Sequence, residues 1–236
     1  MTRIFDILLS LAGMIVLFPL MVPVMIALKL SGEHRVFYLQ RRVGRHGKEF
    51  RILKFATMLQ DSPSMPGAFV TQKDDPRVLP LGRALRKTKI NELPQLANVL
   101  LGQMSLVGPR PLVAEHLLAY AAEARAAVLR QRPGVTGLAS LVFRDEEAVL
   151  DRMPGDRTRN HDLVVAPYKG ELEKWHAENR SVGLYFSILF RTAVRVLFPG
   201  ALAGLPPYRG LPQAPAALAP HLDARTAGSA ELRNDG

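Results

Sequence analysis

The sequence predicts a mostly helical α/β domain that follows an N-terminal membrane helix. Three observations lead to this fold class. Residues 7–28 carry no charged side chain and as a helix would extend roughly 33 Å, enough to cross the apolar core of a bilayer. Two short stretches rich in β-favouring residues, 36–40 and 50–55, follow and predict a hairpin. Helical patterns then dominate, at 91–102, 112–131, 171–179 and 184–198.

The apolar segment carries features of a helix that does not cross the bilayer. Pro19 and Pro23 lie inside it, and each removes a backbone donor, which predicts a bend near the middle. Basic residues flank both ends, Arg3 before it and Lys29 after it, and positive charges favour the cytoplasmic side. We therefore expect a re-entrant helix bent at Pro19 over residues 1–30, with a straight spanning helix as the open alternative.

The charge of the chain predicts an anionic partner. Lys and Arg number 31 against 21 Asp and Glu, a formal net charge of +10. Nucleic acid, anionic lipid and phosphorylated small molecules all fit such an excess. The basic residues of 29–54 follow the membrane segment directly, which favours contact with anionic headgroups. The basic stretches lack the interleaved aromatic residues that stack on bases, so we expect no nucleic-acid partner.

Positive charge gathers around one carboxylate, Glu92, at the expected start of a helix capped by Asn91. Arginine binds phosphate oxygens with two parallel hydrogen bonds, and a helix N-terminus adds unpaired N–H groups. Glu92 could also hold a Mg²⁺ ion that bridges a diphosphate. The candidate phosphate ligands are Lys54, Arg77, Arg86 and Arg110. Solvated arginines, or arginines that contact headgroups, are the alternative.

Several other chemistries are excluded or disfavoured. The chain has no cysteine, which excludes disulfides, thiolate metal sites and a cysteine nucleophile. The six histidines lie far apart in the sequence, and we expect each of them to be structural. Neither a GxxxxGK[ST] loop nor a GxGxxG fingerprint is present, so nucleotide binding by those routes is not expected.

The C-terminal part of the chain divides into a helix and a tail. Within 184–198, Ser187, Arg191 and Arg195 recur every four residues and apolar residues cover the rest. Such a helix suits a membrane interface, with a core helix as the alternative. Residues 201–236 are rich in Pro and Ala without periodicity, which predicts a disordered tail. The expected domains are thus 1–30, 31–200 and 201–236.

A series of short motifs runs in a fixed order between Arg3 and Phe198. In that order and spacing they resemble the monotopic phosphoglycosyl transferases, the bacterial sugar transferases that start glycan assembly on a polyprenol carrier. Each motif alone is weak, but their combination is specific. The motifs are QRRVG at 40–44, KFATM at 54–58, DPR at 75–77, ELPQ at 92–95, NVL at 98–100, MSLVGPRP at 104–111 and RPGVTGL at 132–138.

The resemblance implies a fold, a reaction and a place in the cell. It implies a small catalytic α/β domain on the cytoplasmic face of the bacterial inner membrane, behind a re-entrant helix. The implied reaction transfers a phosphosugar from a UDP-sugar to polyprenol phosphate and releases UMP, with Mg²⁺ as cofactor, as the first membrane step of exopolysaccharide or glycoconjugate synthesis. Gln95 and Pro111 lie in matching motifs and join the candidate substrate-binding residues. Neither the sugar nor the oligomeric state follows from the sequence.

The chain departs from the family pattern at the residue where the chemistry starts. The family uses an Asp–Glu pair in which Asp attacks phosphorus, and Asn91 stands at the Asp position beside Glu92. An amide oxygen is a poor nucleophile. Three readings remain open: Glu92 or another acid such as Asp75 attacks, polyprenol phosphate attacks directly, or the chain is an impaired relative that only binds its ligands or a partner. Ala56 also replaces an expected Arg after Lys54-Phe55.

Overall fold

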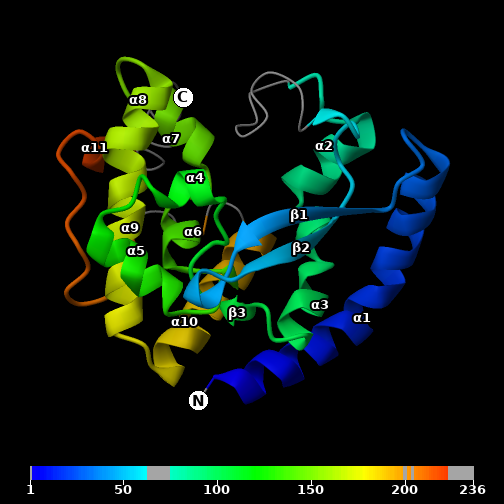
Figure 1. Ribbon diagram of the computed structural model, residues 1–236, viewed down its shortest axis with the longest axis horizontal. Coiled ribbons are helices and arrows are strands. Elements are labelled where there is room, and N and C mark those ends of the chain that lie inside the picture. Colours follow the sequence, from blue (N-terminus) through cyan, green and yellow to red (C-terminus); the bar gives the residue numbers. More distant parts are fainter. Residues whose placement is uncertain (1, 63–74, 199–200, 203–204, 223–236) are drawn as a thin grey trace, which may run out of the picture. The chain divides into compact units, whose positions relative to one another are not determined.

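The chain was analysed as a computed structural model, which describes residues 2–62, 75–198, 201–202 and 205–222. The chain divides into two compact units. Unit 1 comprises Met1–Thr2, Arg42–Glu49 and Ser105–Gly236, and unit 2 comprises Arg3–Arg41 and Phe50–Met104. Helices predominate in both, and the two small sheets have two strands each (Figure 1). This confirms the mostly helical α/β class.

Unit 2 is built on α1 (Arg3–Leu30), which continues through Pro19 and Pro23 as one helix. Figure 1 shows it as a long, curved helix, as expected where prolines remove hydrogen bonds from one side. By length and composition it could cross a membrane. Only 11% of its most apolar stretch is buried within the chain. The many exposed leucines and isoleucines of α1 therefore form a large apolar surface.

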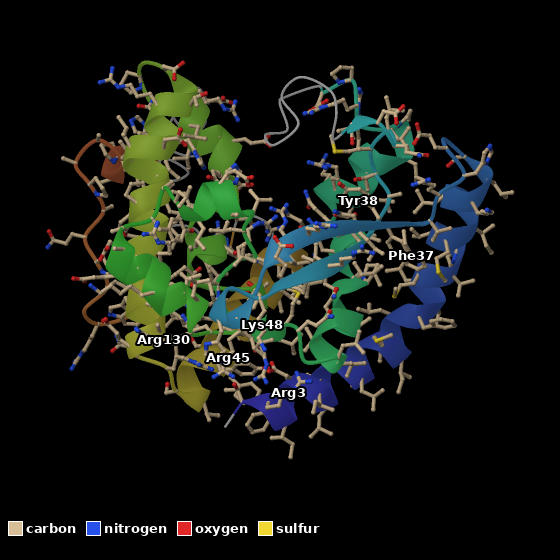
Figure 2. The ribbon with its side chains drawn as sticks, viewed as in Figure 1. Arg3, Phe37, Tyr38, Arg45, Lys48 and Arg130 are labelled. Atoms are coloured by element: carbon tan, nitrogen blue, oxygen red, sulfur yellow. The ribbon has the colours of Figure 1, made fainter. Side chains whose placement is uncertain are left out.

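Both ends of α1 are fixed to the rest of unit 2. At its start, the Arg3 guanidinium donates to the carbonyls of Val99 at 2.7 Å and Leu100 at 3.0 Å (Figure 2). These carbonyls end helix α3 (Gln95–Leu100), where unpaired carbonyls and the helix dipole favour a cation. Near its other end, α1 contributes two buried residues, Met21 and Leu28, to an apolar cluster that also contains Phe55 and Leu85.

The remainder of unit 2 begins with the predicted hairpin, which is confirmed as β1 (Phe37–Val43) and β2 (Glu49–Phe55) joined by the 3₁₀ turn η1 (Arg45–Gly47). Its outer part, 42–49, belongs to unit 1. Helix α2 (Pro80–Lys87), the 3₁₀ turn η3 (Ile90–Glu92) and α3 follow. Most of the loop expected at 59–76 lies outside the described residues.

Unit 1 is centred on a parallel pair of strands, β3 (Ser105–Val107) and β4 (Gly134–Thr136). A Cβ atom on Gly108 would lie 2.4 Å from the Arg132 carbonyl oxygen, and one on Gly137 would lie 2.1 Å from that of Gly108. No side chain fits at such distances. The glycines of the VGPRP and GVTG motifs therefore let the two strand ends approach each other closely.

Short helices make up much of the rest of unit 1: α4 (Ala114–Leu117), α5 (Ala122–Leu129), α6 (Leu138–Val142), α7 (Glu146–Arg152) and α8 (Arg157–Asn160). A π-helical turn, η4 (His161–Val165), leads into α9 (Ala166–Glu178). The single helix expected at 112–131 was wrong, because the chain breaks between α4 and α5. The strand suggested for 135–143 is limited to β4, and α6 follows at once.

Helix α10 (Val182–Leu197) does not expose its polar side chains as the predicted interfacial helix would. Arg195 is 5% exposed and donates to the Leu141 carbonyl, and Ser187 forms a 2.9 Å hydrogen bond with the Tyr208 hydroxyl. The recurring polar side chains thus face other segments of unit 1, where they find hydrogen-bond partners. Phe186 and Phe190, by contrast, are 40% and 66% exposed.

The expectation of a disordered tail is wrong for residues 205–222, which pack against the helices of unit 1. Tyr208 stacks on Trp175 with a centroid separation of 6.0 Å, and Arg191 lies over the Tyr208 ring. Leu218 is fully buried, and a last short helix, α11 (Ala219–Leu222), follows. Periodicity could not find this segment, because its anchors are single side chains between prolines. Residues 223–236 lie outside the described part of the chain.

Candidate active site

The Asn91–Glu92 pair lies in the turn η3 between α2 and α3. Lys89 adopts a left-handed conformation with φ 61° at the start of this turn, an uncommon geometry for a residue with a side chain. The expectation that Asn91 caps the next helix was wrong, since Pro94 occupies that position. Asn91 is instead 7% exposed, and its Oδ1 atom finds no hydrogen-bond partner among the described residues. Glu92 is half-buried.

Asn98 ties α3 to β2 and so fixes the surroundings of this turn. Its Oδ1 accepts from Leu53 N at 2.9 Å, and its Nδ2 donates to the Arg51 carbonyl at 2.8 Å. Lys54, a candidate phosphate ligand, is the next residue of β2 and is half-buried. Gln95 opens α3 and is 3% exposed. In the sequence Asn98 is recognisable only as part of the NVL motif, and its hydrogen bonds to β2 become visible only in the fold.

Asp75 and Arg77 form a buried ion pair in the same unit. Arg77 Nη2 lies 2.6 Å from Asp75 Oδ2, and Arg77 Nε donates to Asp75 Oδ1 at 2.9 Å. The hydrogen bond with Asp75 is the main reason that the pKa of Arg77 is raised above its ordinary value. Both Asp75 oxygens are thus engaged by Arg77, which makes Asp75 a poor candidate for a nucleophile.

Unit 2 therefore contains six of the eight predicted site residues, namely Lys54, Arg77, Arg86, Asn91, Glu92 and Gln95. Arg86 lies in the last turn of α2, and α2 packs against η3. Their roles in substrate binding and catalysis stay predictions. The other two, Arg110 and Pro111, belong to unit 1.

Arg110 follows β3 directly and is held in place by its neighbours. Gly134 N donates to the Pro109 carbonyl at 2.8 Å, and Pro111 is buried. Arg110 itself is exposed and lines a small surface pocket together with Pro109, Gly44 and Gln131. Ligands of parallel sheets commonly bind at the carboxyl ends of the strands, and this is where Arg110 lies.

A cluster of ionisable side chains that the sequence did not reveal is centred on Glu146 in unit 1. Lys169 Nζ contacts both oxygens of Glu146, at 3.0 and 2.9 Å, and His161 Nε2 lies 3.5 Å from Glu146 Oε1. Burial acts to raise the pKa of Glu146, but Lys169, His161 and Arg110 together lower it. His116, whose ring centroid is 6.1 Å from that of His161, completes this Glu146 cluster.

A buried carboxyl group of unit 1, Glu173, lies near the carboxyl end of β4. Its Oε1 accepts from Ala139 N at the start of α6, and it is 1% exposed. Burial raises its pKa to about 7. His176, one turn further along α9, is also buried, and burial lowers its pKa to about 4. Both groups thus tend toward their uncharged forms.

The donor atoms of the Asn91–Glu92 turn fit a hard cation. Among the described residues no group of three or more His, Cys, Asp or Glu side chains could hold a metal ion. Magnesium, however, needs only one or two protein oxygens when substrate phosphates and water supply the rest. The buried Asn91 Oδ1 and the neighbouring Glu92 carboxylate offer such oxygens.

Comparison with known proteins supports one family. Residues 1–199 match the model for the bacterial sugar transferase family. The exopolysaccharide production protein ExoY of Sinorhizobium fredii is 40% identical over 65% of this chain and 74% of its own length. The exopolysaccharide production protein PSS of Rhizobium leguminosarum bv. phaseoli is 34% identical over 84% of this chain and 96% of its own.

A third relative has a name that states a reaction. The undecaprenyl-phosphate galactose phosphotransferase of Salmonella typhimurium is 34% identical over 83% of this chain, which spans 40% of that longer protein. The family match covers everything that the sequence motifs covered, from the start of α1 to the end of α10. The chain therefore belongs to the bacterial sugar transferase family.

Proposed function

We propose that the protein transfers a phosphosugar from a UDP-sugar to undecaprenyl phosphate, as the first membrane step of exopolysaccharide synthesis. The observation that carries this proposal is the family match over residues 1–199. It is supported by a relative named for the same kind of reaction and by two named for exopolysaccharide production. In this proposal residues 31–200 act as the catalytic domain behind a membrane helix at 1–30.

The reaction we propose for this chain is a direct displacement. Asn91 cannot form a stable acyl phosphate, and the Asp75 carboxylate is engaged by Arg77. Glu92 is then the carboxylate that remains for this site, whereas the covalent mechanism of the family uses two carboxylates, an Asp and a Glu. An oxygen of the acceptor phosphate forms the new bond to the sugar-linked phosphorus. The bond from that phosphorus to UMP breaks, and UMP leaves with the electron pair.

Magnesium fits this proposal as a cofactor. The Asn91 Oδ1 atom and the Glu92 carboxylate would hold it, and bound magnesium neutralises charge on the diphosphate. In unit 2, Lys54 and Arg86 would supply further positive charge to the phosphates, because preorganised cations stabilise a transition state better than mobile water does. The phosphate contact of Arg110 in unit 1 stays a separate prediction. The Asn91 amide itself would orient an oxygen toward the cation and carry no bond to phosphorus.

The membrane arrangement that we propose is a re-entrant α1 with the catalytic domain at the cytoplasmic face of the inner membrane. Its support is that Arg3, at the start of α1, bonds to α3, while Leu28, near its end, packs in the same unit. A helix that spanned the bilayer would leave one end on the far side. The exposed Phe186 and Phe190 of α10 suit an interfacial position, and the basic residues of 29–54 suit anionic lipids.

The test uses the full chain, purified and reconstituted with undecaprenyl phosphate and magnesium. UMP release would be measured with UDP-glucose, UDP-galactose, UDP-N-acetylglucosamine and UDP-N-acetylgalactosamine. We expect one donor at least to give acceptor-dependent UMP release. We expect Glu92→Gln to lower that rate by about 10³-fold or more, as removal of a central charged group does in other enzymes. Silence with every donor would favour a relative that binds its ligands without turning them over.

A further inference from the structure

Helix α10 turns its polar side chains toward the rest of unit 1 and an apolar stripe outward. Arg195 donates to a backbone carbonyl of α6, and Thr192 forms a 2.8 Å hydrogen bond with Thr136 at the end of β4. Tyr185 and Ile188 are buried on the same inner side. A surface helix of a soluble protein normally points its apolar stripe at the core. The outward stripe carries no charge and consists of Val182, Phe186, Phe190, Ala193 and Leu197.

The C-terminal segment 205–222 contacts the polar side of α10 through Tyr208. The Tyr208 ring stacks on Trp175 of α9, with a centroid separation of 6.0 Å and an interplanar angle of 15°. Its hydroxyl shares a 2.9 Å hydrogen bond with Ser187, and Arg191 Cζ lies 5.6 Å from the centre of the ring. Ser187 and Arg191 are about one helical turn apart on α10. Tyr208 therefore contacts two successive turns of the helix.

The segment that carries Tyr208 is itself anchored to unit 1 at other points. The Tyr168 hydroxyl on α9 donates to the Pro212 carbonyl at 3.0 Å, and Leu218 is fully buried. Figure 1 shows the segment, in orange, beside α9. Because Tyr208 is held by α9 and by this anchored segment, it can fix how α10 is rotated about its own axis.

The outward stripe of α10 fits the surface of a lipid bilayer. Phenylalanine and aliphatic side chains supply the apolar area with which interfacial helices bind lipid. Arg180, exposed just before the helix, suits an anionic headgroup. The last residues of the chain, 223–236, contain one large apolar residue, Leu232, which is too little to cover two phenylalanines. A second copy of the chain is the alternative occupant, and labelling distinguishes it from lipid.

We propose that Tyr208 is a positioning residue that fixes the rotation of α10 and so makes the outward stripe a lipid-binding surface. This inference rests on the proposed membrane arrangement, which places the chain at a bilayer. Tyr208 contacts the polar side of α10 and acts on the stripe through the helix. Without Tyr208, Ser187 and Arg191 would lose the ring and hydroxyl that keep them on the inner side, and the helix could turn.

The test measures how deeply single positions of the full chain enter lipid. The chain has no cysteine, so one introduced cysteine carries a fluorophore at one known place. Ala193→Cys labels the stripe, and Glu147→Cys labels an exposed position on α7, at the other end of unit 1 from α10 in Figure 1. The chain is reconstituted in phosphatidylcholine vesicles that contain spin-labelled phosphatidylcholine. We expect lipid quenching of the label at position 193 and little quenching at position 147.

Tyr208→Ala should lower the quenching at position 193 by about twofold or more, because a helix that can turn no longer keeps the stripe in the lipid. Trp175 is the single tryptophan of the chain, so its emission spectrum shows independently whether its contact with residue 208 is lost. Arg209→Ala, at the exposed next residue, is the matched control and should change neither signal. If Tyr208→Ala unfolds unit 1, Arg191→Gln, which removes the cation over the ring, carries the same test.

The inference is overturned if the label at position 193 stays unquenched in vesicles that contain the chain, as it would if a second copy covered the stripe. It is also overturned if Tyr208→Ala changes the Trp175 spectrum and leaves the quenching unchanged. Quenching involves no turnover, so an inactive chain that shows these effects would overturn only the proposed reaction. A chain that does not associate with the vesicles would overturn the membrane arrangement and this inference together.

Discussion

At the scale of single residues, the identity of Asn91 is the reason for proposing direct displacement instead of a covalent intermediate. Its sequence position suggested a helix cap, yet the fold buries it with an unpartnered Oδ1 among the described residues. A buried polar atom without a partner costs about 1–3 kcal/mol of folding free energy. Such a cost is expected at a functional site, where the missing partner arrives with the ligand. Asn91 is thus explained better by binding than by stability.

Replacing Asn91 by Asp should restore the covalent route of the family. An Asp carboxylate at this position can attack phosphorus, so we expect Asn91→Asp to form a phosphosugar adduct when incubated with UDP-sugar and magnesium alone. Wild type should form none, because it needs the acceptor as nucleophile. Intact-protein mass spectrometry measures the adduct. An adduct on wild type at Glu92 would contradict direct displacement.

At the scale of elements, α9 carries buried groups that make stability depend on pH. Glu173 has its pKa raised to about 7 by burial, so the folded state prefers its protonated form. The stabilisation is complete below the ordinary carboxyl pKa and is lost as pH rises through about 7. The loss is about 3 kcal/mol between these limits. His176 acts in the opposite direction, with stability lost as pH falls below its ordinary pKa toward about 4.

Glu173→Gln should remove the alkaline part of this dependence. Glutamine stays neutral and keeps an oxygen that can accept from Ala139 N. We therefore expect the free energy of unfolding to fall between pH 5 and pH 8 in wild type, and to fall by about 3 kcal/mol less in the variant. Denaturant titrations at both pH values measure the difference. His176 is common to both proteins, so its contribution cancels, and parallel pH curves would contradict the assignment.

At the scale of the whole molecule, the C-terminal segment 205–222 extends the fold past the family match. That match ends at residue 199, yet Tyr208 contacts α9 and α10, and the Tyr168 hydroxyl donates to the Pro212 carbonyl at 3.0 Å. Arg152 on α7 donates to the His221 carbonyl. These contacts connect helices that carry the Glu146 cluster, so the segment braces unit 1.

The segment should therefore contribute to the stability of the folded chain. Leu218 is fully buried, and we expect Leu218→Ala to lower the free energy of unfolding by about 2–4 kcal/mol through lost contacts and a cavity. Leu205, in the same segment, is 36% exposed, so Leu205→Ala should cost less than about 1 kcal/mol. Thermal unfolding of both variants measures this. Equal, negligible effects would indicate a tail that does not pack.

Sequence alone determined the class of fold, the long apolar N-terminal helix, the hairpin and the family. These features follow from local composition and from motif order, which need no knowledge of which segments meet. The sequence also predicts the candidate site residues of unit 2, because phosphate chemistry limits the side chains that can serve. Their roles remain predictions, as does the assignment of Arg110.

Only the tertiary structure decided which residues are partners. The Asp75–Arg77 pair, the inward turn of Arg195 and the Glu146 cluster each depend on side chains brought together by packing. Residues 116, 146, 161 and 169 share no spacing that a periodic pattern could detect. Asn91 is the clearest case. The sequence shows that the usual nucleophile is missing, and only the fold shows that the Asn91 side chain is buried with an Oδ1 atom that has no hydrogen-bond partner among the described residues.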